Sequence, residues 1–336
     1  MPVNELIFFA NKVLVNGTVL GSVYALGAIG VTLIFGILRF AHFAHGDMMT
    51  MGAFVAFTLT AIATALGIHT FWPTGFIVLP LAMPITALVA LGIDRVFYQP
   101  LRVRGAKPVT LLIASIGVTL MLQGLIRLFF GVENRSFFID DAKRMLRFDL
   151  PFAGATRSIT ISEPQVLLIV VTVVAVIALH LFLTRSRLGK GMRAMADNSD
   201  LARVTGINTR EIIRATWIIA GGLACLAGTM LALDVSLKPD LAFNIVLPIF
   251  AASVVGGLGQ AYGAIAGGFL VGFAETLAVF NWSTVLRPFS GLLPAGWTLP
   301  DDLSLVSTDY KLTVAFVILV VVLLVRPTGI FRGAVT

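Results

Sequence analysis

Long apolar stretches, almost free of charged residues, follow one another along nearly the whole chain. A helix of about 20 apolar residues crosses a hydrocarbon layer roughly 30 Å thick, so each stretch is expected to span a membrane. Only 12% of the 336 residues are charged, about half the share of a typical soluble protein. The sequence therefore predicts an all-α, polytopic transmembrane helical bundle that forms one domain over residues 1–336. The nine expected spans are 14–38, 46–67, 75–97, 109–131, 164–184, 212–234, 242–258, 263–282 and 311–326.

Two of these spans are irregular. The first, 14–38, is long enough to be tilted or broken. The seventh, 242–258, is short and runs into the string GGLG, so it is the span that would not cross fully. Eight spans is therefore the alternative count.

Basic residues are concentrated in two loops, 98–108 and 185–211. Lys and Arg are retained in the cytoplasmic loops of membrane proteins, which explains the net charge of +7 without a nucleic-acid partner. Two spans separate the loops, so both can face the cytoplasm. Nine spans then place the C-terminal tail inside, and the N-terminus and the loops 132–163 and 283–310 outside.

The polar loop 185–211 is expected to contain a short amphipathic helix from about Gly191 to Thr205, ended by Gly206 in a left-handed conformation. Such a helix can lie on lipid, cover its own bundle, or dock in a groove of a partner protein. Acidic residues among the basic ones argue against simple lipid binding, whereas composition leaves the other two roles open. One face would carry Met192, Met195, Ala196 and Ala202, while Arg193, Asp197 and Asp200 would point elsewhere.

A few polar residues fall within the apolar stretches, where ionisable groups are costly and are functional candidates by default. Arg127 and Asp234 lie near span ends, where a side chain can reach water. For Glu275, an interhelical hydrogen bond and a place on a transport pathway both stay open. The remaining two are Asn16 and Gln123.

Two further patterns concern glycine and histidine. Gly259, Gly263 and Gly267 repeat at every fourth residue, which favours close helix packing over a glycine-lined pathway. The string FAHFAHGD contains His42, His45 and Asp47, which could form a metal or proton-relay cluster. We favour a cytoplasmic turn, in which Gly46 permits the bend and Asp47 caps the next helix.

Motifs for catalysis or nucleotide binding are missing from the sequence. The string nearest to the phosphate-binding loop G-x-x-x-x-G-K-[ST] is RLGKGM, which lacks the upstream glycine and the hydroxyl residue. No Cys/His spacing fits zinc, and there is no G-x-S-x-G elbow. We therefore expect a chain that is not an enzyme and has no cofactor and no metal.

Five strings, in order along nearly the whole chain, resemble the permeases of branched-chain amino acid ABC transporters, and among them the H-type subunit. Four are NGTVLGSVYALGAIGVTLIFGILRFAHFAHGDMMTMGAF, DRVFYQPLR, VVGGLGQAYGAIAGGFLVGFAETL and RPTGIFR. The fifth, RLGKGMRAMADNSDLARVTGIN, is similar to the cytoplasmic loop of these permeases. The chain departs from the family at Phe43 and in a longer segment at 278–310. The matching loop positions are Ser186, Arg187, Gly189, Arg193, Ala194, Ala202, Gly206, Ile207 and Asn208.

The resemblance implies one subunit of an importer in the bacterial inner membrane. A second permease would complete the pathway, two cytoplasmic ATPases would drive it, and a periplasmic binding protein would deliver the solute. The helix of the polar loop would be the coupling helix, set in a cleft of one ATPase through Arg193, Ala194, Asp197, Leu201, Ala202 and Gly206. The candidates for the substrate pathway are Asn16, Gly21, Gln123, Gly257 and Glu275.

Branched-chain amino acids are the expected substrates, although similar permeases serve urea, short amides and aromatic acids, and no pocket signature separates these. A stand-alone secondary carrier or channel is the alternative class. It would need a coupling-ion site within its own spans, and the few acids there make it the weaker hypothesis. A membrane-embedded enzyme would need a catalytic constellation that the sequence lacks.

Overall fold

The computed structural model describes residues 2–68, 71–138, 143–149, 156–288 and 299–331. Its first half contains α1 (Pro2–Phe9), α2 (Asn16–Leu38), α3 (His45–Ala65), α4 (Thr74–Ile77), α5 (Leu79–Ile93), α6 (Gln99–Val103) and α7 (Pro108–Phe130). The second half contains β1 (Met145–Phe148), β2 (Ile159–Ser162), α8 (Glu163–Arg185), α9 (Arg187–Asp197), α10 (Ser199–Val204), α11 (Thr209–Asp234), α12 (Phe243–Gly256), α13 (Ala261–Val279), α14 (Ser283–Leu286) and α15 (Lys311–Val325).

Eight helices in the described ranges are long and apolar enough to cross a membrane, which confirms the all-α polytopic bundle. The ninth expected span, 242–258, is the exception. Its helix α12 has only 14 residues, about 21 Å of α-helix, and is too short to cross the hydrocarbon layer. By length and composition the described ranges hold eight full spans, and α12 covers only part of the layer between α11 and α13.

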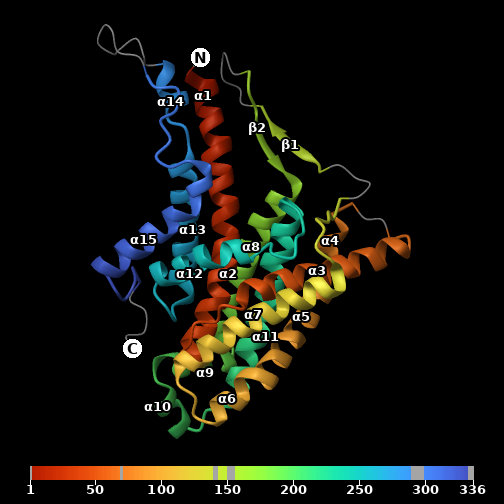
Figure 1. The fold of residues 1–336 in the computed structure, drawn as a ribbon, viewed down its shortest axis with the longest axis vertical. Helices are drawn as coiled ribbons and strands as arrows, with labels where there is room; N and C mark the ends of the chain where they lie inside the picture. The colour runs from red at the N-terminus through yellow and green to blue at the C-terminus, as the bar shows by residue number, and fades with distance from the viewer. Residues whose placement is uncertain (1, 69–70, 139–142, 150–155, 289–298, 332–336) are drawn as a thin grey trace.

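The first span is longer than the sequence indicated. A π-helical turn, Ala10–Val15, joins α1 to α2, so that an unbroken helix of 36 residues runs from Val3 to Leu38. The predicted start at residue 14 is wrong because the apolar helix continues back through α1. At about 54 Å the helix is longer than the hydrocarbon layer is thick. In Figure 1 it runs along the long axis, with the N-terminus at one end and α9 and α10 towards the other.

Glycines create the tightest helix packing in the bundle. The largest contact between two helices joins α2 to α13, and in it Gly268 lies against the backbone of Ala25 while Gly272 lies against that of Gly21. A Cβ on Gly268 would stand only 2.5 Å from the backbone nitrogen of Ala25. Of the predicted repeat, Gly263 and Gly267 lie against the backbone of Gly256 and Ala252 in α12, which confirms its role in helix packing. Gly259 is the exception, because its φ of 88° places it in the turn between α12 and α13.

After α2 the chain turns back and is buried within the bundle. The predicted cytoplasmic turn, with its bend at Gly46 and a cap from Asp47, is wrong. Arg39 ends α2 with a φ of 56°, so the bend comes before Gly46. Helix α3 begins at His45 with no side-chain cap, which leaves Asp47 inside its first turn. His45 packs against Gly30, about two helical turns before the end of α2. The expected cytoplasmic turn is thus a buried segment of the core.

The N-terminal end of the long helix is tied to two loop regions. Asn4 accepts hydrogen bonds from the backbone of Thr156 and Arg157, beside the antiparallel β1–β2 hairpin. The rings of Phe9 and Phe280 pack edge to face, with centroids 5.3 Å apart. These contacts gather the described parts of the loops 132–163 and 283–310 at the same end of the bundle (Figure 1).

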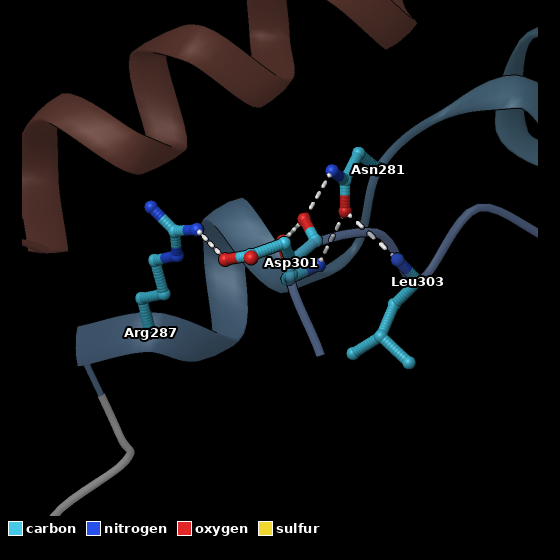
Figure 2. Close-up of polar contacts among 5 residues, drawn as sticks. Asn281, Arg287, Asp301 and Leu303 are labelled. Atoms are coloured by element: carbon cyan, nitrogen blue, oxygen red, sulfur yellow. Dashed lines mark hydrogen bonds and ion pairs between the residues drawn. The ribbon is translucent and has the colours of Figure 1, made fainter. Parts of the chain in front are cut away.

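The segment after Phe280 is held by a compact set of polar contacts (Figure 2). The Asn281 side chain donates to the carbonyl oxygen of Asp301 at 2.9 Å and accepts from the backbone N–H of Leu303 at 3.1 Å. An exposed ion pair joins Arg287 to Asp301 at 3.1 Å. The two described ends of this loop are therefore fastened to each other.

Candidate functional site

The polar loop folds as two short helices, which corrects the prediction of one helix from Gly191 to Thr205. Helix α9 begins at Arg187 because the Ser186 hydroxyl accepts the N–H of Gly189 at 2.8 Å, an N-cap that the sequence reading overlooked. The helix ends at Asp197, since Asn198 takes an extended conformation.

Asn198 also starts the second helix. Its side-chain oxygen accepts the N–H groups of Asp200 and Leu201, at 3.1 and 2.9 Å, and so caps α10. Gly206 has a φ of 84°, which confirms the predicted left-handed stop. The helix is broken at Asn198 because its side-chain cap competes with continuation of the helix. The spacing of apolar residues does not reveal such a cap.

The faces of the two helices agree with the prediction. Met192, Met195 and Ala202 are buried against the bundle. Arg193 and Asp197 of α9 are exposed, as is Leu201 of α10. The predicted coupling residues therefore divide into two groups. The exposed group is Arg193, Asp197, Leu201 and Gly206, while Ala202 is buried and Ala194 lies between the two extremes.

Helix α9 is seated closely on the helices that flank it. Gly189 lies against the backbone of Phe182 and Leu183, near the end of α8, where a Cβ has no room. Gly191 faces the side chain of Ile212 at the start of α11. The N-terminal half of α9 is therefore held by close contacts with α8 and α11.

The other end of α9 is held by an arginine from the end of α2. The Arg39 guanidinium donates to the carbonyl oxygen of Ala196 at 2.5 Å. The Cβ of Ala196 also approaches Gly36 of α2.

A groove of about 500 Å³ opens between α9 and the start of α11. Lys190 and Glu211 bring charges of both signs to it, and Ala194 and Ile207 give it an apolar part. One predicted coupling residue, Ala194, thus lines a concave surface, and a mixed surface of this kind fits a protein partner better than lipid.

Glu275 lies in a buried polar cluster that links three helices. Its carboxylate accepts a hydrogen bond from the Tyr24 hydroxyl of α2 at 2.9 Å and is 3.7 Å from the Lys311 ammonium of α15. The Glu275 side chain is fully buried, whereas that of Lys311 is about one third exposed. The interhelical hydrogen bond considered from the sequence is therefore present.

The other predicted pathway residues lie apart from one another. Asn16 is exposed on the first helix, and Gly21 packs against Phe269. Gln123 is buried on α7 and accepts from Arg127 at 3.3 Å, near the end of that helix. Gly257, with a φ of 107°, lies in the turn after α12.

None of the five pathway candidates lines the groove beside α9 or the second described cavity, an apolar groove of about 420 Å³ between α5, α8 and α11. Their role in the pathway stays a prediction.

Comparison with known proteins identifies the family. Residues 13–323 match the family model described as the permease component of the branched-chain amino acid transport system. The chain belongs to this permease family. It is a multi-pass inner-membrane protein and a transport subunit, not a catalytic one.

The relatives match this permease over almost their full length. LivH, the high-affinity branched-chain amino acid transport system permease protein of Escherichia coli (strain K12), is 34% identical over 94% of this chain and 93% of its own. BraD, the corresponding protein of Pseudomonas aeruginosa, is 31% identical over 94% of each chain. A probable LivH of Methanocaldococcus jannaschii is 27% identical over 95% of this chain and 92% of its own. No solved structure gives a significant match.

His42, which the sequence suggested together with His45 and Asp47, has buried partners that the sequence did not indicate. His42 lies 3.1 Å from the Tyr98 hydroxyl and 3.3 Å from the Met48 sulfur, and Tyr98 stacks on Trp217. Within the described ranges, no three His, Cys, Asp or Glu side chains lie close enough to hold a metal ion. His42 lies in the string FAHFAHGD and Tyr98 in DRVFYQPLR. No periodic pattern in the sequence indicates that these two strings are close in space.

Proposed function

We propose that this permease is the membrane subunit of an ATP-driven importer that moves branched-chain amino acids or related small solutes inward. The observation that carries the proposal is the exposed charged face of α9, with Arg193 and Asp197, on a helix pair fastened to the bundle. The apolar face of α9 is already buried in the bundle, and an exposed face with charges of both signs suits a soluble protein partner better than lipid. The chain also lacks the phosphate-binding loop for its own ATP hydrolysis.

The partners follow from this assignment. Two ATPase subunits bind on the side of α9 and α10, a second permease completes the pathway, and a solute-binding protein docks at the opposite end. ATP binding favours one of two conformations of the permease pair through the α9 contact. The basic residues of the loop support its placement in the cytoplasm.

The substrate class is supported by the relatives. LivH and BraD carry names that assign them to high-affinity branched-chain amino acid transport, and their likeness covers almost the whole chain. Urea, short amides and aromatic acids are the competing substrates. Transport of radiolabelled leucine, with each competing solute present in excess, separates these classes.

Co-purification tests the ATPase contact. The permease is co-expressed with candidate ATPase subunits, and the amount of ATPase retained is measured for Arg193→Glu and Asp197→Lys. Both charge reversals are expected to reduce retention, because each places a like charge against the partner. Lys238→Glu is the control, since this exposed residue follows α11 at the far end of the bundle. Leucine uptake by the permease alone, with no ATPase bound, would instead establish the secondary-carrier alternative.

A further inference from the structure

Arg39 has an unusual backbone conformation. In the part of the chain that the structure describes, it is the one non-glycine residue with a positive φ, 56°. The left-handed region is disfavoured for a residue that carries a Cβ, because the Cβ crowds the following carbonyl oxygen. A side chain kept at such a position needs a compensating contact.

The compensating contact is with α9. The Arg39 guanidinium donates to the carbonyl oxygen of Ala196 at 2.5 Å, across 157 residues of sequence. Ala196 lies in the last turn of α9, where carbonyl groups have no partner within the helix. A cation at this end also complements the helix dipole. The hydrogen bond therefore both caps α9 and fixes the position of its C-terminal end.

The backbone of Arg39 connects to the transmembrane core. Its backbone ends α2, and the next residue, Phe40, is already buried. Phe43 then stacks on Phe250 of α12, with ring centroids 4.6 Å apart. Gly36 of α2 also touches Gly259 in the turn between α12 and α13. One residue thus stands where α9 meets the ends of α2 and α12.

We propose that Arg39 is the positioning residue through which a displacement of α9 is passed to α2. The proposal rests on the proposed function, in which α9 receives the motion of an ATPase. The apolar contacts of α9 with α8 and α11 tie it to its neighbours in sequence. The Arg39 bond instead ties it to the long first helix, and its loss leaves α9 docked but less firmly connected to α2.

The test uses the whole transporter reconstituted in lipid vesicles, with substrate uptake and ATP hydrolysis measured on the same sample. Arg39→Gly suits the left-handed backbone and removes the whole side chain, and with it the bond to α9. We expect uptake per ATP hydrolysed to fall about tenfold, since a hydrogen bond to a charged group is lost, while hydrolysis itself stays within about twofold. Arg39→Lys, which keeps a positively charged donor, is expected to recover most of the uptake. Unchanged uptake per ATP in Arg39→Gly overturns the proposal.

Arg135→Gln is the matched control. The Arg135 guanidinium donates to the carbonyl oxygen of Phe130 at 2.9 Å, at the end of α7 and away from α9. Arg135 lies at the end where the binding protein would dock, so any effect of this variant on docking should lower uptake and hydrolysis together and leave their ratio normal. A similar loss of coupling in both arginine variants would show a general loss of helix-end contacts and would contradict a specific role for Arg39.

Hydrogen exchange on the permease alone gives a second readout. Amide exchange in the last turn of α9 is expected to be faster in Arg39→Gly than in the unchanged protein, and unchanged in Arg135→Gln. Equal exchange in all three overturns the proposed link. If instead the permease binds no ATPase in any form, the proposed function fails, while the exchange result still decides whether Arg39 holds α9.

Discussion

The α2–α13 contact and the α9–α10 loop are held in place by different means. Between α2 and α13, glycines such as Gly268 and Gly272 bring backbone against backbone, with no room for a side chain. The loop has one such close approach, at Gly189, and is otherwise held by contacts at helix ends, through the caps of Ser186 and Asn198 and the bond from Arg39. Close packing transmits force but tolerates little change, whereas capped ends can shift without repacking. The α2–α13 contact is therefore suited to move as a rigid unit, whereas the α9–α10 loop is suited to shift relative to the bundle.

The largest effect is expected where the close packing is broken. Gly268→Val should lower the free energy of unfolding by about 3 kcal/mol or more, because its Cβ would collide with the backbone of Ala25. Thermal unfolding in detergent measures the change. Gly124→Ala is the control, since open space surrounds Gly124 in α7, and alanine should raise helix stability by about 0.5–1 kcal/mol. Equal destabilisation by both substitutions would contradict this account of the α2–α13 contact.

The next largest effect is expected in the polar cluster beside that contact. Tyr24→Phe removes the hydrogen bond to the buried Glu275 carboxylate and should cost about 1–3 kcal/mol of stability. Tyr262→Phe provides the comparison, because Tyr262 bonds His180 on the surface. That change should stay within about 0.5 kcal/mol. A neutral Tyr24→Phe would mean that Lys311 alone satisfies the carboxylate.

Loss of a cap in the loop is expected to have a smaller and local effect. Asn198→Ala should destabilise α10 by about 1 kcal/mol, because the N–H groups of Asp200 and Leu201 lose their acceptor. Amide exchange at residues 199–204 reports the change, while exchange in α13 should not respond. Asn198→Ser, which keeps a capping oxygen, should exchange nearly as the unchanged protein does. Faster exchange throughout the bundle would contradict a local role.

The smallest effect on stability is expected at the exposed tip of the loop. Leu201 is 61% exposed, so Leu201→Ala should change the free energy of unfolding by less than about 0.5 kcal/mol. If the tip binds an ATPase, affinity for that partner should fall about tenfold, as for an apolar contact residue at an interface. Binding to the purified ATPase measures it. An unchanged affinity would show that Leu201 is not part of the proposed contact. The exposed Val204 would then be the next residue to test.

Much of the fold could be predicted because hydrophobicity acts over whole helices. The spans, the buried face of Met192 and Met195, and the glycine packing all follow from periodic patterns. The structure extended the first span back to Val3, because the polar residues Asn4 and Asn11 did not interrupt the helix. Those side chains instead bond the segment 156–160.

The errors arose where a single residue determined the local path. Arg39 makes the turn that the sequence predicts at Gly46, and Asn198 interrupts the helix that the sequence predicts to reach Thr205. Arg39 acts through its left-handed backbone and a bond to a residue distant in sequence, and Asn198 acts through a side-chain cap. Neither effect leaves a periodic pattern in the sequence. For the same reason, the sequence correctly predicted the buried and exposed faces of α9 and α10 but not the residues at which these helices begin and end.

The length of the first helix has a mechanical consequence. Its 36 residues make a rod of about 54 Å, with Arg39 directly after its last residue and Asn4 at its tip. A rod pivoting near one end acts as a lever. A tilt of about 5° at the Arg39 end would carry the tip, and with it the segment that Asn4 holds, through about 5 Å. The π-helical turn at Ala10–Val15 sets the compliance of this lever, because it interrupts the regular ladder of hydrogen bonds between the tip and the pivot.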